Sequence, residues 1–430
     1  MTKMRSGRFL PCNGSWSATV VMSITACGCL IFVNGARAQD VLAPAPVVFS
    51  TAPPVVTEIQ SNSSGFIDFG NATPAGALQE KPFQVGPLDL HPHFSYQFLY
   101  ATGVQFAPGS AQDTITQNVS PGLLVDIGRN WALDYTPTWT TYSSREFHDT
   151  WNHAATLNGV ASYNDWLFGF SQTYNRSDSP LIVTGGQTLQ QIYVTTLTGS
   201  YRFNTVLSMD LSAGQNFTYT EHFTNTREWS TTDWLNYQFW PELDGSLGIG
   251  GGYDNVSVGV DSSFEQYQAR VSWRATQVTS VVVHGGAEDR QFLGSSGSDL
   301  LSPIFGATIR YAPFPSTAIA LDADRSVTVS PFLDEVIEAT DVTAMLNQRL
   351  LGKLFLNAGG GYHWDTYRSA SSVITTSRRD ENYTLNASLT CVFLKRATAS
   401  ATYQYSENLS TQGGFGFSSN QYGFQLGYQY

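Results

Sequence analysis

The sequence predicts an all-β protein: a transmembrane, antiparallel, up-and-down β-barrel of about 18 strands. Charged residues make up 13% of the chain, about half of the ~25% usual in soluble domains. From Leu88 to the end, apolar and polar residues alternate with period two, which is typical of strands with one apolar face. No apolar window of membrane-helix length follows the N-terminal region, which argues against helical spans.

The N-terminal region has the pattern of a signal peptide. Three basic residues precede an apolar run at 18–33, and Ala36-Arg37-Ala38 forms a small-residue cleavage site. We therefore expect residues 1–38 to be removed after Ala38 and the chain to be exported to the cell outer membrane. Two alternatives are a lipoprotein signal ending at Cys27 and an N-terminal membrane anchor. The apolar run continues past Cys27 and is short for a membrane span, so both are weaker predictions.

Export changes the charge and the cysteine content. Residues 1–38 contain four basic and no acidic residues, so the formal net charge falls from −12 to −16. A nucleic acid is a poor partner for so acidic a chain. Of the four cysteines, Cys391 alone remains after cleavage. The exported chain is therefore expected to fold without an internal disulfide.

Two further segments follow the signal peptide. Residues 39–87 are rich in Pro, Ala and Ser, as in "VLAPAPVVFSTAPPVV", and show no sustained period. We expect a periplasmic lead-in that is largely disordered. Residues 88–430 form the predicted barrel.

Short and long breaks alternate along the barrel segment. The short breaks lie at 128–130, 163–165, Asn204, 241–244, 276–279, 313–316, 350–353 and 394–397. The longer polar stretches between them lie at 143–150, 175–186, 220–228, 254–263, 289–299 and 365–382. This alternation predicts short periplasmic turns and longer extracellular loops. An even number of strands places both ends of the barrel in the periplasm.

In the last ten residues, "QYGFQLGYQY", aromatic and apolar residues alternate with Gln and Gly, so one face of the strand is apolar and the other is Gln/Gly. Such a strand must pair with the first one, because an open edge in lipid leaves backbone groups unsatisfied. The alternating apolar residues ending in an aromatic resemble the C-terminal assembly signal of bacterial outer-membrane proteins: Tyr422, Phe424, Leu426, Tyr428 and Tyr430. The wider chain resembles β-barrel porins, some of which are associated with exopolysaccharide export. The resemblance implies outer-membrane lipid and the barrel-assembly machinery as partners; the oligomeric state stays undetermined.

Several charged residues fall on the polar faces of the predicted strands. These candidate pore-lining residues are Arg202, Asp210, Arg270, Arg274, Arg310, Asp322 and Asp324. Their positions alternate with apolar neighbours, and a charge on the lipid face would cost ~2–4 kcal/mol near the midplane. One interpretation is a wet wall with local ion pairs, and the other is a charged constriction that selects solutes by sign.

No motif predicts catalysis, a cofactor or a metal. The pair in "HPH", His91 and His93, resembles two metal ligands, but nothing near in sequence completes a site. The glycine-rich stretches at 248–253 and 358–362 lack the lysine and helix of a phosphate-binding loop. Five tryptophans flank breaks, as in an interface girdle, with sugar stacking as the alternative: Trp139, Trp166, Trp240, Trp273 and Trp364.

These observations predict a non-enzymatic outer-membrane channel for passive passage of small hydrophilic solutes or polysaccharide. The alternative is a structural or adhesive outer-membrane barrel with a blocked lumen. A soluble secreted β protein would show the same alternation but would stay in solution without detergent.

Overall fold

A computed structural model describes residues 83–294, 298–371, 378–394 and 396–430. The predicted signal peptide, 1–38, and residues 39–82 of the predicted lead-in lie outside the described residues. Every regular element in the described part is a β-strand. Within it, no helix is long and apolar enough to cross a membrane.

The strands form one sheet in which each strand pairs with its sequence neighbours in antiparallel fashion. They are β1 (Phe83–Val85), β2 (Leu88–Ala107), β3 (Ser110–Ile127), β4 (Trp131–Tyr142), β5 (Thr150–Tyr163), β6 (Trp166–Leu181), β7 (Gly186–Arg202), β8 (Leu207–Thr220), β9 (Thr226–Trp240), β10 (Leu243–Val256), β11 (Ser262–Thr276), β12 (Thr279–Phe292), β13 (Leu300–Phe314), β14 (Thr317–Val329), β15 (Glu335–Leu351), β16 (Leu354–Ser369), β17 (Arg379–Val392), β18 (Ala397–Ser410) and β19 (Phe417–Gln429).

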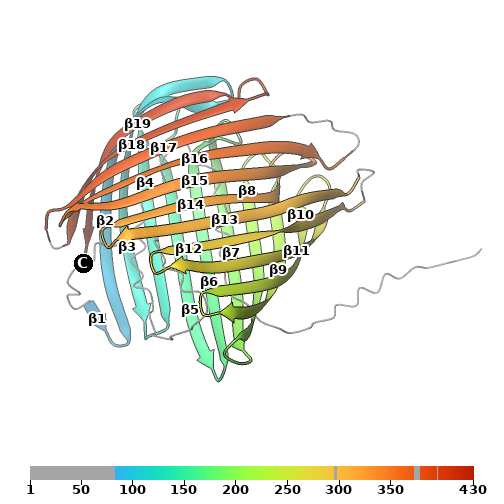
Figure 1. The fold of residues 1–430 in the computed structure, drawn as a ribbon. Coiled ribbons are helices and arrows are strands. Elements are labelled where there is room, and N and C mark those ends of the chain that lie inside the picture. Colours follow the sequence, from blue (N-terminus) through green and yellow to red (C-terminus); the bar gives the residue numbers. More distant parts are fainter. Residues whose placement is uncertain (1–82, 295–297, 372–377, 395) are drawn as a thin grey trace, which may run out of the picture.

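The sheet closes on itself because β19 also pairs with β2. Strands β2 to β19 therefore form a closed barrel, which confirms the predicted fold class of about 18 strands. In Figure 1 the strands of the near wall cross those of the far wall at a steep angle, as tilted barrel strands do.

The two rims of the barrel differ in the length of their connections. The terminal rim contains the start of β2, the end of β19 and all the predicted short breaks. The opposite rim, here called the loop rim, has longer connections such as 143–149 and 370–378. The strands nevertheless extend further into the polar stretches than the sequence predicts. Backbone pairing needs no apolar side chains, so strands continue beyond the apolar band.

The barrel closes at the end of the chain, as predicted. Tyr428 lies opposite Phe94, and the amide of Tyr430 donates to the carbonyl of Pro92 at 3.0 Å. The short β1 pairs with the start of β2 on the side where β19 has ended. The Phe83 ring stacks on Tyr430 with centroids 4.1 Å apart, so β1 continues the line of the terminal strand. Figure 1 shows the C-terminus beside β1 and β2.

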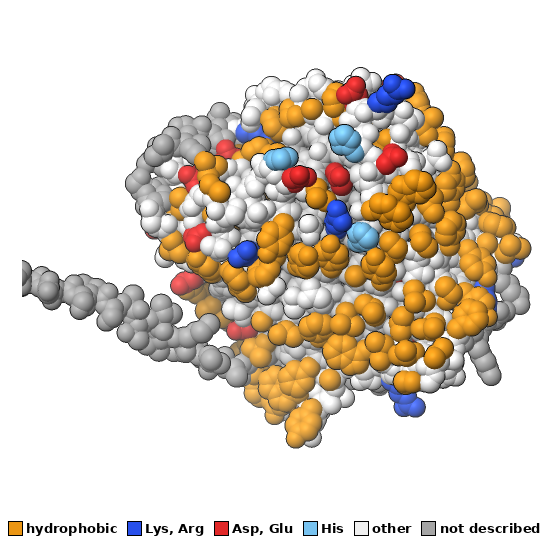
Figure 2. Space-filling model, turned by 180° about the vertical axis from the view of Figure 1, so that it is seen from behind, with side chains coloured by type: hydrophobic (Ala, Val, Ile, Leu, Met, Phe, Trp, Pro, Cys, Tyr) orange, Lys and Arg blue, Asp and Glu red, His pale blue; other side chains and the backbone are white. Residues whose placement is uncertain are grey.

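The outer face of the barrel is apolar. Tyr422, Phe424, Leu426 and Tyr428 are all exposed, and hydrophobic side chains cover much of the surface in Figure 2. Trp229 and Phe239 lie near opposite ends of β9, both exposed. About ten residue steps at ~3.4 Å with a tilt of ~45° give an apolar band of ~24 Å, close to the ~25 Å of outer-membrane barrels.

One carboxylate departs from this pattern. Asp233 pairs laterally with Leu211 and Ile249 in the middle of the outer face of β9. Charged residues are expected on the inner face on energetic grounds, and Asp233 is an exception. Its cost is lower than that of a cation, because an aspartate on the lipid face is less unfavourable than Arg or Lys.

Candidate functional site

The concave inner face is identified by contacts that skip a strand. Arg270 of β11 reaches Asn236 of β9 at 2.9 Å, and His93 of β2 reaches Thr136 of β4 at 2.9 Å. Side chains two strands apart meet only where they converge, on the inside of the barrel. The residues in register with these contacts therefore face the lumen.

Two of the candidate pore-lining residues belong to one buried cluster. Asp210 accepts hydrogen bonds from Ser200, at 3.0 Å, and from Asn236. Arg270 donates to the same Asn236 and stacks over Trp234 at 4.3 Å from the ring centroid. Because Asn236 connects them, Asp210 and Arg270 form a local polar network in the wall.

The other candidates are more dispersed. Asp322 accepts a hydrogen bond from Thr308 at 2.8 Å, and Asp324 lies 3.6 Å from His284. Arg310 is on the same inner face of β13 as Thr308. Arg202 and Arg274 are exposed at the terminal rim, where the Arg274 guanidinium donates to the carbonyl of Pro241. The structure therefore holds Arg270 in the polar network of the wall and leaves Arg202 and Arg274 exposed at the terminal rim.

Two charged clusters on the inner face were missed by the sequence analysis. Buried Arg290 pairs with Asp254 and, at 2.9 Å, with Glu288. The His363 ring lies between Asp341 and Asp365. Each cluster includes one residue from another strand, Asp254 or Asp341, so the alternation pattern alone does not show that the three residues meet.

The loop rim is partly covered by the β14–β15 hairpin. Pairing of β13 with β14 stops at Phe305 and Arg325, while β14 and β15 stay paired up to Val329 and Val336. Beyond that point the hairpin lies over the inner face of β12 and β13. Arg290 donates to the carbonyl of Val327 at 3.4 Å, and Ser302 donates to Glu338 at 3.0 Å.

The β6–β7 hairpin also folds inward. Its pairing with β5 stops at Arg176, and its tip, 181–185, is buried. The backbone of Gly186 lies so close to β2 that an added Cβ would be 2.6 Å from the carbonyl oxygen of Phe106. Since β2 and β7 are not neighbours in the sheet, this contact crosses the lumen.

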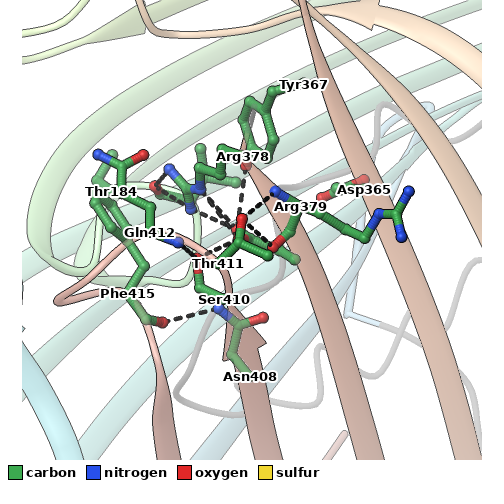
Figure 3. A network of polar contacts seen from close by, with 12 residues as sticks. Thr184, Asp365, Tyr367, Arg378, Arg379, Asn408, Ser410, Thr411, Gln412 and Phe415 are labelled. Atoms are coloured by element: carbon green, nitrogen blue, oxygen red, sulfur yellow. Dashed lines mark hydrogen bonds and ion pairs between the residues drawn. The ribbon is translucent and has the colours of Figure 1, made fainter. Parts of the chain in front are cut away.

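Arg378 joins these loops (Figure 3). Its guanidinium is paired with Asp380, and both residues are buried, with exposed fractions of 4% and 3%. It donates to the carbonyl of Val183 in the β6–β7 tip at 3.3 Å. Asp380 also accepts from Ser410 at 2.6 Å and from the Tyr367 hydroxyl at 3.4 Å. We call Arg378, Asp380 and the Val183 carbonyl the latch.

Aromatic rings surround the latch and connect three more loops. The Arg378 guanidinium lies 3.8 Å from the Phe415 ring centroid and 5.4 Å from that of Phe332. Phe332, at the β14–β15 tip, also contacts Phe223 of the β8–β9 loop, with centroids 5.5 Å apart. Beside it, the amide of Thr224 donates to Pro331 at 2.9 Å. Loops from well-separated positions of the barrel therefore meet over the lumen.

The lumen below this cover is polar and partly accessible. Thr343 and Met345 on the inner face of β15 are exposed, Met345 by 51%. Asn386 on the inner face of β17 is exposed as well. Towards the loop rim, in contrast, inner-face residues such as Glu288 and Asn382 are almost completely buried. The interior is thus open towards the terminal rim and covered at the loop rim.

The remaining sequence candidates have structural partners. His91 lies 3.2 Å from Asp126, and His93 lies 3.9 Å from Asp134. Within the described residues, no group of three or more His, Cys, Asp or Glu side chains could hold a metal ion. The five tryptophans lie towards the ends of their strands, four of them clearly exposed, in the arrangement of interface girdles.

One sequence signal could have indicated the inward loops. The stretch "PLIV" at 180–183 is apolar, although it lies in the middle of a polar loop. An apolar loop tip is most stable when something covers it. No local signal singles out Arg378: Asp380 is two residues away, but Val183, Phe332 and Phe415 come from three separate loops.

Comparison with known proteins agrees with the barrel. The model of the family described as putative beta-barrel porin 2 matches residues 286–430. No curated protein sequence matches the chain. Similar solved structures include OccK11 (OpdR) of Pseudomonas aeruginosa, with 11% identity, TM-score 0.41, and coverage of 81% of this chain and 97% of that one. OccAB4 of Acinetobacter baumannii has 12% identity, TM-score 0.43, and coverage of 82% and 100%. The siderophore receptor PirA of Acinetobacter baumannii has 6% identity, TM-score 0.45, and coverage of 79% and 80%.

The fold itself rests on the closed strand pairing, and the family match covers the strands from the end of β12 to β19. The predicted resemblance to β-barrel porins is confirmed. The chain is therefore a closed antiparallel β-barrel whose C-terminal third resembles the β-barrel porin family.

Proposed function

We propose that the protein is an outer-membrane channel through which small hydrophilic solutes diffuse passively. The observation that supports this function is the polar inner face, with exposed polar side chains such as Thr343 and Asn386 in the middle of the barrel. A barrel of this size encloses more space than its own side chains fill. The terminal rim then faces the periplasm and the loop rim faces the exterior.

The covered loop rim supports a refinement of this proposal. The latch and the rings around it hold the β6–β7 and β14–β15 hairpins over the exterior mouth. In this proposal the mouth is closed in the resting protein, and solutes pass when the hairpins swing outward. The strands below the hairpins keep their pairing, so opening does not require the barrel to unfold.

The same cover also favours the second candidate, a structural or adhesive barrel with a blocked lumen. The two functions differ in a planar-bilayer recording of the purified, folded protein. A channel gives discrete current steps, and these become more frequent when the latch is broken. The channel function is contradicted by a barrel that gives no current even when the latch is broken. The same barrel must insert into the bilayer and show the mobility of a folded barrel in unheated gels.

An enzymatic function has less support. The matched family is described as a porin. The polar clusters of the inner face, such as Arg290 with Asp254 and Glu288, are satisfied internally and buried. We therefore propose transport without chemistry.

A further inference from the structure

One arc of the inner face has no charged side chain between the two rims. It consists of the inward-facing residues of five adjacent strands, β17 from Asn382, β18, β19, β2 from Ser95 to Ala101, and β3 from Thr114 to Ser120; we call it the uncharged wall. Ser, Thr, Asn and Gln dominate it. A single lateral row runs Ser400, Gln425, Gln97 and Asn118 across four strands.

The opposite arc has the reverse character. The inner faces of β10 to β16 contain Asp254, Arg270, Glu288, Arg290, Arg310, Asp322, Asp324, Asp341 and Asp365. Charged side chains are thus numerous on the inner faces of β10 to β16 and absent from the uncharged wall. Random placement would mix charged and uncharged polar residues over the whole inner face. Their separation therefore indicates a functional or structural cause.

Several buried polar atoms of the uncharged wall have no hydrogen-bond partner among the described residues. Neither amide atom of Asn382 has a hydrogen-bond partner among the described residues, and its exposed fraction is 2%. The same holds for one side-chain atom in each of five further residues: Asn118, Thr402, Asn408, Ser419 and Gln425. Most buried polar groups in proteins are paired, and leaving one unpaired is unfavourable because it has lost its hydrogen bonds to water. A ligand that pairs with these atoms would recover that cost.

The chemistry of the wall restricts the ligand. Amide and hydroxyl groups offer donors and acceptors but no charge, and a ligand hydroxyl can serve both. An ion that left water for this wall would lose hydration without gaining a counter-charge. We propose that the uncharged wall binds uncharged, polyhydroxylated solutes of the saccharide or polyol class along the path through the barrel. This inference rests on the proposed channel function and names its substrate class.

The test is titration calorimetry of the full, folded barrel in detergent with a neutral linear hexamer of glucose. The variant combines Asn382→Leu, Thr402→Val and Gln425→Met, which keep the side-chain volumes and remove the polar atoms. The matched control is Asp322→Asn with Asp324→Asn on the opposite arc. We expect the triple variant to weaken binding at least about tenfold, because it removes several hydrogen bonds to the ligand at once. The control should bind as the original chain does.

A hexamer of the same length carrying a carboxylate on every sugar should bind at least about tenfold more weakly than the neutral one. Three results would each overturn the proposal. The triple variant and the control could lose the same amount of affinity, the two hexamers could bind equally well, or the neutral hexamer could fail to bind. If the triple variant does not fold, Asn382→Leu and Thr402→Val are measured separately. Conductance of the same preparations and of their Arg378→Ala counterparts, in which the latch is broken, separates the two claims. A conducting barrel without hexamer binding refutes this inference alone. Hexamer binding with no conductance even when the latch is broken refutes the channel.

Discussion

Replacing Arg378 by Ala should open the exterior mouth. The substitution leaves Asp380 buried without its cation and removes the donor to the Val183 carbonyl. Breaking a buried ion pair by removing one partner costs ~3–5 kcal/mol. Asp380 keeps its hydrogen bonds from Ser410 and Tyr367, so the lower end of that range applies.

A loss of ~3 kcal/mol in the closed state raises the ratio of open to closed molecules about a hundredfold. The assay is single-channel recording in planar bilayers at equal protein density. We expect the open probability to rise steeply, while the barrel keeps its mobility in unheated gels because none of the strand pairing involves the Arg378 side chain.

The matched control removes both charges, as Arg378→Met with Asp380→Leu. Replacing both members of a buried pair by apolar residues is often neutral. The new side chains would pack against Phe332, Phe415 and Tyr367, which already surround the guanidinium. The double variant should therefore stay closed. Equal conductance of the single variant and the original chain, or equal opening of the single and double variants, would refute the latch.

Four further outcomes are expected. Deleting Tyr430 removes the ring between Phe83 and Arg396 and the last bond to β2, so the variant should fail to assemble; normal yield of heat-modifiable barrel would contradict this. Arg290→Met leaves Asp254 and Glu288 buried without a cation, and should lower the free energy of unfolding by more than ~3 kcal/mol in urea titrations; a change under ~1 kcal/mol would count against the cluster. Asp233→Leu places an apolar residue on the lipid face and should raise that free energy by ~1–2 kcal/mol in vesicles, and a decrease would show that Asp233 is not facing lipid. Arg274→Ser at the terminal rim should shift the reversal potential towards cation selectivity. Arg270→Ser should leave the reversal potential unchanged, because Asn236 holds the Arg270 guanidinium in the wall. The opposite pattern would mean that permeating ions contact Arg270.

The fold could be predicted because the features of a membrane barrel follow from local sequence patterns. Alternation with period two separates the two faces of every strand, and a strand pairs with its sequence neighbour through a short turn. Each predicted short break lies at the terminal rim, and Tyr422 to Tyr430 form the closing strand. The partners of each strand are adjacent in sequence, so no long-range information is needed.

The length of the loops was predicted less well. The stretches at 175–186 and 365–382 are polar in sequence, yet much of each is strand. Hydropathy marks where the apolar band ends, whereas strand pairing continues as long as backbone hydrogen bonds can form. The sequence therefore indicates the edge of the membrane better than the end of the strand.

The sequence by itself determined the architecture of this protein: its strands, their pairing, its apolar outer band and the face on which most polar side chains lie. Tertiary structure alone decided what those polar side chains meet. Arg378 finds Asp380 two residues away but Val183 across the barrel, and Asn382 joins an uncharged wall made with strands from the other end of the chain. The physical reason is that the period and the hydropathy of a sequence describe one strand at a time. Closure of the sheet brings together residues that are separated by hundreds of positions. Their meeting depends on the placement of all the strands together.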